Sequence, residues 1–253
     1  MNTVAIHYFN GRDGVRLAYR ELGQGRPLIL FHGYMGNAQK AWVESGHAAK
    51  LAAQQHHVIL PDLRGHGDSA RPHEASAYPA DVLADDGLAL IEQLGIEEYD
   101  LGGYSLGARV TLRMLARRAA PRRAILGGQG LDVINRTSAR TGRYRQLTVQ
   151  GETSEGGSAE GAMPDWIRRS GIDMVAMGRI LDTFVETPVE ALRQVQAPVL
   201  VIRGSEDSER PHADQLAALF PQGRYLTVPG DHRTAFTNPQ FIAAINEFLA
   251  EGL

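Results

Sequence analysis

Short runs of apolar residues recur along the chain, and most are separated by longer segments in which apolar residues return every three or four positions. Because a parallel sheet is covered on both faces, its strands carry continuous apolar runs. The short runs predict strands over residues 28–31, 58–60, 99–103, 124–126, 198–202 and 225–228. A hairpin is expected before them, over residues 6–9 and 15–20, because a turn rich in Gly, Asn and Asp separates these segments.

The longer segments predict helices between the strands. In residues 83–94, for example, Leu83, Leu90 and Leu94 share one face, and Gly95 ends the pattern. Further helices are expected over residues 42–54, from Ser105 onward, over residues 213–220, and along the apolar stripe from Phe241 to Leu249. The alternation predicts an α/β fold with a mainly parallel central sheet and helices on both faces.

The alternation stops at about residue 131 and returns near residue 188. The interval contains a basic stretch over residues 136–145, a glycine-rich stretch over residues 151–161, and an amphipathic helix with Met174, Met177, Leu181 and Phe184 on one face. We therefore expect residues 1–130 and 188–253 to form one core, and residues 131–187 to form a small cap-like insertion that controls access. The basic stretch is expected to be a solvated face.

Composition limits the kinds of site that the chain can build. The net charge of −3 and the pI near 6.3 give no global attraction for nucleic acid or anionic lipid. The chain has no cysteine, which excludes disulfides, thiolate metal sites and a cysteine nucleophile, and which suits a reducing compartment. We see no signal-peptide pattern and no apolar segment long enough to span a bilayer, so a cytoplasmic protein is expected.

The strongest local signal for chemistry is Gly103-Tyr104-Ser105-Leu106-Gly107, between a predicted strand and a predicted helix. On such a tight turn the serine backbone is strained, and larger side chains at the two glycine positions would clash. The hydroxyl of Ser105 then lies at a helix N-terminus, where the helix dipole stabilises negative charge. We predict that Ser105 is a nucleophile.

A serine hydroxyl needs a base, and the base needs a partner that orients it. His232 follows the last predicted strand, where open α/β sheets build their sites, and is the expected base. Asp207 follows the strand over residues 198–202 and is the expected acid, with Glu206 and Asp132 as rivals. Asp231 adjoins His232 in sequence and is expected to be a loop residue, because neighbouring side chains rarely meet in the required geometry.

Backbone amides complete the predicted site. The segment Phe31-His32-Gly33-Tyr34 ends an early strand, so the Tyr34 amide and the Leu106 amide can together bind an oxyanion. The motif from Asp62 to Ser69 follows another strand and is expected to form a hydrogen-bonded turn at the border of the site. No metal or organic cofactor is expected, since no metal-ligand spacing occurs, and adjacent His56 and His57 on a strand would point to opposite faces.

These motifs together resemble the α/β-hydrolase superfamily, in the branch with an H-G-x turn, D-x-R-G-x-G-x-S, G-x-S-x-G, G-x-x-D and a late histidine. They occur in the family's order from residue 31 to residue 232. The resemblance implies the α/β-hydrolase fold and a Ser105-Asp207-His232 triad. Ser105 at the nucleophile position argues against haloalkane dehalogenases, which carry aspartate there.

The resemblance identifies the superfamily but not the substrate, because members include esterases, lipases, lactonases, C–C bond hydrolases, perhydrolases and a few lyases. The expected function is hydrolysis of a small-molecule ester, lactone or related compound through an acyl-enzyme. Two alternatives remain: a C–C bond hydrolase or lyase on the same triad, and a non-catalytic binding protein with this fold. The sequence does not indicate an oligomeric state.

Arg109 bears on the lyase alternative. In the lyase of menaquinone biosynthesis an arginine follows the elbow, and Arg109 matches that position, although Ala108 replaces a glycine. Arg109, Arg113 and Arg117 also repeat every four residues, so a solvated helical stripe explains them equally well.

Overall fold

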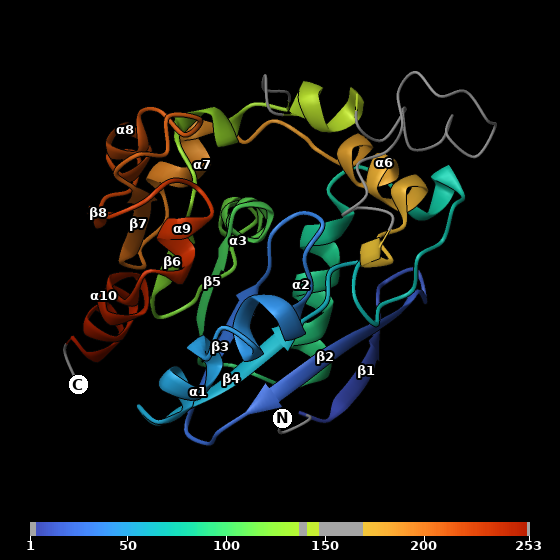
Figure 1. Cartoon of the computed structure of the whole chain (residues 1–253), viewed down its shortest axis with the longest axis horizontal. Coiled ribbons are helices and arrows are strands. Elements are labelled where there is room, and N and C mark those ends of the chain that lie inside the picture. The colour runs from blue at the N-terminus through green and yellow to red at the C-terminus, as the bar shows by residue number, and fades with distance from the viewer. Residues whose placement is uncertain (1–3, 137–140, 147–168, 252–253) are drawn as a thin grey trace.

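The computed structural model describes residues 4–136, 141–146 and 169–251 of the 253-residue chain. Its centre is an eight-stranded sheet in the order β1-β2-β4-β3-β5-β6-β7-β8 (Figure 1). The strands are β1 (Ile6–Asn10), β2 (Arg16–Leu22), β3 (Arg26–Phe31), β4 (His56–Pro61), β5 (Asp100–Tyr104), β6 (Ala124–Gly127), β7 (Val199–Gly204) and β8 (Gly223–Val228).

The sheet is parallel apart from its first hairpin. β1 pairs antiparallel with β2, and β2 pairs antiparallel with β4, whereas the six strands from β4 to β8 run parallel. The pleat divides each apolar run between two cores: Leu28 and Leu30 of β3 lie in one core, and Ile29 and Phe31 lie in the other. The predicted α/β fold with a mainly parallel sheet is confirmed.

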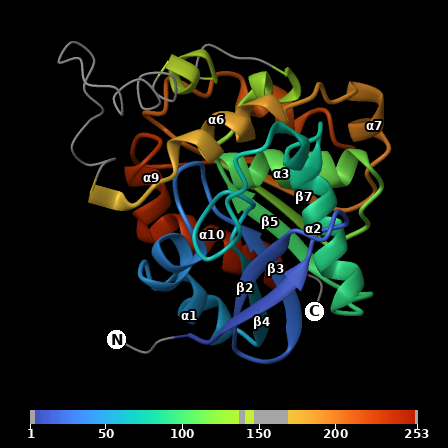
Figure 2. The same ribbon diagram turned by 90° about the vertical axis from the view of Figure 1, so that its right-hand side faces the viewer.

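Helices cover both faces (Figures 1 and 2). On one face the core includes residues of α1, α9 and α10, and on the other it includes residues of α2, α3, α6, α7 and α8. Their bounds are α1 (His47–Ala52), α2 (Val82–Gln93), α3 (Leu106–Ala116), α6 (Met174–Asp182), α7 (Val189–Arg193), α8 (Ala213–Ala217), α9 (Thr234–Thr237) and α10 (Pro239–Ala250). Three short helical turns join them: η1 (Gln39–Val43), η2 (Ala75–Ala77) and η3 (Leu131–Ile134). Among the described residues, every helix is too short or too polar to cross a bilayer.

Two predicted helices differ in extent from the observed ones. The helix expected over residues 42–54 is split into the π-helical turn η1 and α1, because Gly46 between them adopts a left-handed conformation with φ 77°. The helix expected over residues 213–220 is shorter and ends at Ala217.

The predicted insertion over residues 131–187 is described only in part. Its described residues are 131–136, 141–146 and 169–187, so the glycine-rich stretch over residues 151–161 lies outside them. In the described part, α6 packs Met174, Met177 and Ile180 into the core formed with α2 and α3, and it lies above α3 in Figure 2. The division of the chain into core and insertion stays a prediction.

One buried arginine joins three separate elements beside the sheet. Arg64 follows β4, and its side chain is fully buried. Its guanidinium donates to Asp86 on α2, at 2.7 and 2.9 Å, and to Asp13 in the β1–β2 turn, at 2.5 and 2.8 Å. Burial raises the pKa of Asp86 to about 6, and Arg64 opposes that rise. The two carboxylates therefore depend on Arg64 for their charge balance.

We expect Arg64→Met to lower the free energy of unfolding by about 3–5 kcal/mol, because it leaves the Asp86 carboxylate buried without its cation. Urea denaturation at neutral pH measures the change. Arg12→Met is the matched control, since Arg12 pairs with Glu92 on the surface and its loss should cost at most about 0.5 kcal/mol. Equal losses in the two variants would contradict this account of Arg64.

Candidate active site

The candidate site lies at the carboxyl ends of three parallel strands. Ser105 directly follows β5, Asp207 lies in the loop after β7, and His232 lies in the loop after β8. The carboxyl ends of parallel strands meet at one edge of a sheet, so residues far apart in sequence converge there. The structure brings these three side chains into contact.

The turn between β5 and α3 is strained at Ser105, whose φ of 55° and ψ of −111° fall outside the ordinary regions for a residue with a side chain. Two glycines permit this turn. A Cβ on Gly103 would lie 2.6 Å from the carbonyl oxygen of Gly107, and a Cβ on Gly107 would lie 2.8 Å from that of His32. The backbone of the elbow is therefore packed directly against itself and against the end of β3.

The three side chains form one line of hydrogen bonds. The Ser105 hydroxyl donates to His232 Nε2 at 3.1 Å, and His232 Nδ1 donates to Asp207 Oδ2 at 2.7 Å. Ser105 and Asp207 are buried. Tyr104 supports the histidine, since its hydroxyl donates to the His232 carbonyl at 2.6 Å and its ring lies 5.2 Å from the imidazole. The imidazole is thus held with one nitrogen on a carboxylate and the other on a hydroxyl.

The rival carboxylates lie elsewhere. Glu206 is exposed, and Asp132 pairs with Arg210 at 3.3 Å. Asp231 bonds within its own turn, where its carboxylate accepts from the amides of Arg233 and Thr234 at 2.8 Å. Asp207 is therefore the carboxylate that contacts His232.

The two predicted oxyanion donors flank the serine. Gly33, next to Tyr34, is so close that a Cβ there would lie 3.5 Å from Ser105 Cβ. Leu106 begins α3 directly after the serine. In the described part of the chain, neither the Tyr34 amide nor the Leu106 amide donates to another backbone group. Both amides are available to a bound oxygen beside Ser105.

Two buried histidines hold the loop that carries Tyr34. His32 Nδ1 donates to the Gly33 carbonyl at 2.8 Å, and its Nε2 accepts from the Leu63 amide at 3.0 Å. His66 Nε2 accepts from the Met35 amide at 3.3 Å. Burial lowers the pKa of both, that of His66 to about 3 with a further contribution from His32. Both imidazoles are therefore neutral and act as fixed acceptors.

Asp62 ties the same loop to the turn after β4. Its carboxylate accepts from the Ala38 amide at 2.7 Å, from the Asp68 amide at 2.9 Å and from Arg20 at 3.0 Å. Ser69 closes the turn by donating to the Asp62 carbonyl at 2.6 Å. The motif from Asp62 to Ser69 is thus a hydrogen-bonded turn that borders the site, as the sequence predicts.

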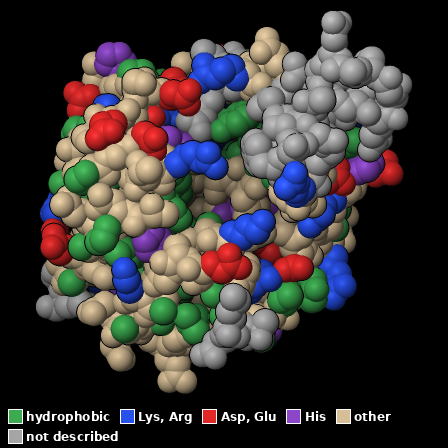
Figure 3. All heavy atoms as spheres, in the orientation of Figure 1, with side chains coloured by type: hydrophobic (Ala, Val, Ile, Leu, Met, Phe, Trp, Pro, Cys, Tyr) green, Lys and Arg blue, Asp and Glu red, His purple; other side chains and the backbone are tan. Residues whose placement is uncertain are grey.

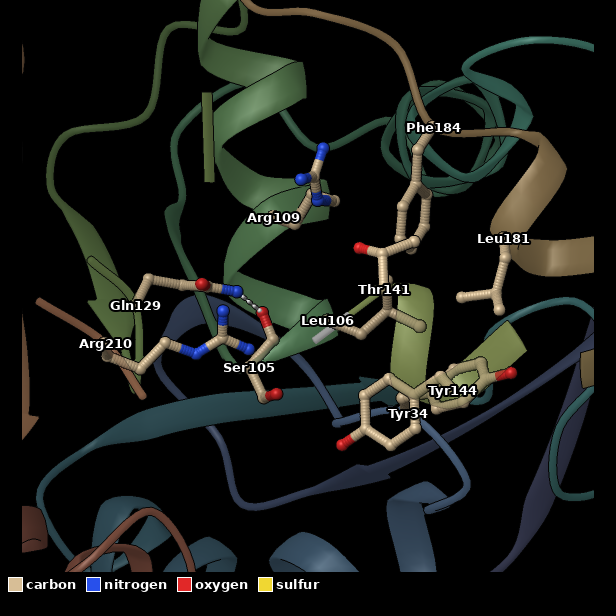
Figure 4. Close-up of a pocket in the computed structure, with 10 residues that line it drawn as sticks. All are labelled: Tyr34, Ser105, Leu106, Arg109, Gln129, Thr141, Tyr144, Leu181, Phe184 and Arg210. Atoms are coloured by element: carbon tan, nitrogen blue, oxygen red, sulfur yellow. Dashed lines mark hydrogen bonds between the residues drawn. The ribbon is translucent and has the colours of Figure 1, made fainter. Parts of the chain in front are cut away.

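Two pockets open on Ser105 and share Tyr34 and Tyr144. The first, of about 390 Å³, extends beneath α6 and is drawn in Figure 4. The second is an open cleft of about 1270 Å³ and is also lined by His232 and Phe236. The serine thus lies where two spaces meet, and only the second borders the histidine.

The interpretation of Arg109 as part of a solvated stripe is wrong. Its side chain is buried and lines the first pocket. Arg113 and Arg117 lie farther along α3 and pair with Asp81. Helical periodicity alone could not reveal this, because the segments that cover Arg109 come much later in the chain.

Other lining residues escaped sequence reasoning. Gln129 donates to the Ser105 carbonyl and follows β6, so its position at a strand end was an available signal. Arg210 carried no such signal. Leu181 and Phe184 of the predicted amphipathic stripe line the first pocket, whereas Met174 and Met177 pack in the core. Within the described residues, no three His, Asp or Glu side chains gather as a metal ion would require.

The buried histidines make stability depend on pH. In the unfolded chain His66 binds a proton below about pH 6.5, whereas in the folded chain its pKa is about 3. The unfolded state therefore holds more protons between these values, and the free energy of unfolding falls as pH falls, by at most about 1.4 kcal/mol per pH unit for one group. Between pH 4 and pH 6, we expect His66→Gln to make the free energy of unfolding less dependent on pH. The slope should fall by the contribution of about one proton.

Urea denaturation across that pH range, compared with the exposed His212→Gln variant, measures the effect. An unchanged slope in His66→Gln, or an equal change in His212→Gln, would contradict the assignment.

Comparison with known proteins relates part of this chain to a family. Residues 26–127 match a family described as alpha/beta hydrolase fold. A Bacillus subtilis AB hydrolase superfamily protein, YisY, is 35% identical over 111 residues, which cover 44% of this chain and 40% of that relative. The match thus spans less than half of that relative's length.

Two further proteins match over nearly the whole chain. Pyrrolizixenacetamide deacetylase of Xenorhabdus hominickii is 27% identical and is aligned over 90% of this chain and 92% of its own. The solved structure of the esterase RhEst1 from Rhodococcus sp. ECU1013 has a TM-score of 0.73 and 25% identity over 97% of this chain and 98% of its own. The described fold is similar to that of the RhEst1 structure.

Proposed function

We propose that the chain belongs to the α/β-hydrolase superfamily and is a serine hydrolase that cleaves a small-molecule ester, lactone or related compound through an acyl-enzyme. The observation that carries the proposal is the line of hydrogen bonds from Ser105 through His232 to Asp207, at 3.1 and 2.7 Å. A pure binding protein has no need of these three side chains in this order, and that disfavours the non-catalytic alternative.

In the proposed reaction the Ser105 oxygen forms a bond to the substrate carbonyl carbon while its proton passes to His232 Nε2. The carbonyl oxygen becomes an oxyanion bound by the Tyr34 and Leu106 amides and favoured by the N-terminus of α3. The bond to the leaving group then breaks, and His232 gives the leaving group its proton. A water activated by His232 hydrolyses the acyl-enzyme and restores Ser105.

Asp207 has two roles in this scheme. It accepts from Nδ1 and so keeps Nε2 free to receive the serine proton, and its charge stabilises the imidazolium that forms. Asp207 is buried, so little water screens that interaction. The strained turn at Ser105 fixes the nucleophile at the mouth of both pockets.

A C–C bond hydrolase or lyase on the same residues is the second candidate, because Arg109 lies in the pocket beside Ser105. A small-molecule substrate and a cytoplasmic location are part of the proposal. The cleft lined by Ser105 and His232 is large enough for the former, and a chain without cysteine suits a reducing compartment.

We expect Ser105→Ala to abolish hydrolysis of p-nitrophenyl esters and labelling by a serine-reactive fluorophosphonate, because it removes the attacking oxygen. Circular dichroism should show an intact fold. The exposed Ser76→Ala variant is the control and should be labelled as the wild type is. Labelling of Ser105→Ala at the wild-type rate would overturn the nucleophile assignment.

We expect Asp207→Asn to lower kcat by about 10³–10⁴, because the amide favours the wrong imidazole tautomer and removes the balancing charge. Asp132→Asn is the matched control, since Asp132 pairs with Arg210 and not with His232. Steady-state kinetics of both variants decide between the two carboxylates. Near-normal turnover in Asp207→Asn would end this assignment.

A further inference from the structure

Arg109 lies one helical turn beyond Ser105 on α3, with 7% of its surface exposed. Figure 4 shows its guanidinium beside the ring of Phe184, above the serine and in the same pocket. A buried cation in a substrate pocket has to be balanced, because an unpaired charge is costly to bury.

The described protein groups balance Arg109 only in part. Its Nη2 donates to the carbonyl of Asn135 at 2.7 Å, and the guanidinium lies 4.5 Å from the Phe184 ring centroid. Its Nη1 is buried and has no hydrogen-bond partner in the described part of the chain. A carbonyl and a ring face stabilise a cation, but neither carries a negative charge.

Its two neighbours on α3 show the contrast. Arg113 donates to both carboxylate oxygens of Asp81, at 2.8 and 2.9 Å. Arg117 pairs with Asp85 at 2.6 Å. Within the described residues, Arg109 has no carboxylate at ion-pair distance. Of these three arginines, the one without a carboxylate partner among the described residues is therefore Arg109, which lines the pocket.

A second arginine adds to the positive charge of the pocket. Arg210 also lines it, with 6% of its surface exposed, and pairs with Asp132. Burial, followed by the charge of Arg210, lowers the pKa of Arg109 to about 10, so Arg109 remains a cation at neutral pH. Among the described residues around the pocket, the guanidinium groups of Arg109 and Arg210 thus lie near the carboxylate of Asp132.

This charge is local. On the face drawn in Figure 3, basic and acidic side chains of the described residues are interspersed, and no broad patch of one sign appears. The cations in the first pocket therefore favour a small anionic group that enters beside Ser105 rather than a large polyanion on the surface.

The position of His232 indicates which part of the substrate meets Arg109. The imidazole gives its proton to the leaving group, so the leaving group lies in the second pocket, which His232 lines. The acyl part then extends into the first pocket, which His232 does not line. Arg109 lies one turn of α3 from Ser105 and lines the same pocket, so a short acyl chain can lie between the two side chains.

We propose that the substrate is a half-ester of a dicarboxylic acid, whose free carboxylate binds the guanidinium of Arg109 at the far end of the acyl pocket. The inference rests on the proposed serine hydrolase function. In the reaction the ester C–O bond breaks, water supplies the hydroxyl of the new carboxyl group, and the alcohol leaves with the proton from His232. The products are a dicarboxylate and an alcohol.

The test compares mono-4-nitrophenyl adipate, whose far carboxylate is free, with methyl 4-nitrophenyl adipate, in which that group is a neutral methyl ester. We expect the wild type to favour the anionic ester in kcat/KM by about tenfold to a hundredfold, the range of a hydrogen bond to a charged group. Arg109→Gln should remove this preference mainly by raising KM for the anionic ester. Arg109→Lys should restore part of the preference.

Arg117→Gln is the matched control, because it removes a cation from the same helix without touching the pocket. Its preference should equal that of the wild type. The ratio of the two esters corrects each variant for any loss of folded protein. Equal kcat/KM for the two esters in the wild type, or an unchanged preference in Arg109→Gln, would overturn the proposal.

Two further measurements separate this proposal from the function on which it rests. Fluorophosphonate labelling of Ser105 together with hydrolysis of the neutral ester, but no charge preference, would refute the anionic substrate alone. Failure of both labelling and hydrolysis would refute the serine hydrolase. Titration calorimetry of Ser105→Ala with monomethyl adipate and with dimethyl adipate then decides the carboxylate site: only the monoanion should bind, and adding Arg109→Gln should abolish binding. Equal binding of the two would refute the site.

Discussion

The candidate site depends on the close contact between the elbow and the end of β3. Gly103 and Gly107 let the backbone around Ser105 pack against the carbonyls of Phe31 and His32, and no residue with a Cβ fits there. This contact fixes the serine oxygen in relation to the Tyr34 amide, which belongs to the segment that follows β3. Ser105 and the Tyr34 amide are thus positioned by this backbone contact, and the side chains of His32, His66 and Asp62 hold the loop that carries Tyr34.

The parallel sheet could be predicted from the sequence because its strands carry unbroken apolar runs and amphipathic helical segments separate them. Ser105, Asp207 and His232 were accessible for a related reason: each follows a strand, and strand ends converge. Their catalytic roles remain a proposal. The burial of Arg109 was not accessible, because it depends on Asn135 and Phe184, which tertiary folding brings over α3. The spacing of residues within one helix does not show which distant segments will pack over it.

The structure uses buried ionisable groups in two different ways. Around Arg64 one guanidinium lies between two carboxylates, and at His32 and His66 burial keeps the imidazoles neutral, so both arrangements hold loops in place through groups of the protein itself. At Arg109 the described protein leaves a cation with a neutral acceptor and a ring. Charges that stabilise a fold are balanced within it, whereas a charge that recognises a ligand is balanced when the ligand arrives.

The meeting of two pockets at Ser105 has a consequence for the acyl-enzyme. In the proposed reaction, once the alcohol has left, the cleft beside His232 is the route by which the next nucleophile reaches the ester bond, and that cleft is wide and open. Water enters it, but a small alcohol or amine present in excess can occupy the same space and accept the same activation from the imidazole. The ratio of hydrolysis to acyl transfer is then set by the contents of the surrounding solution, and the protein would act as a transferase wherever water has a strong competitor.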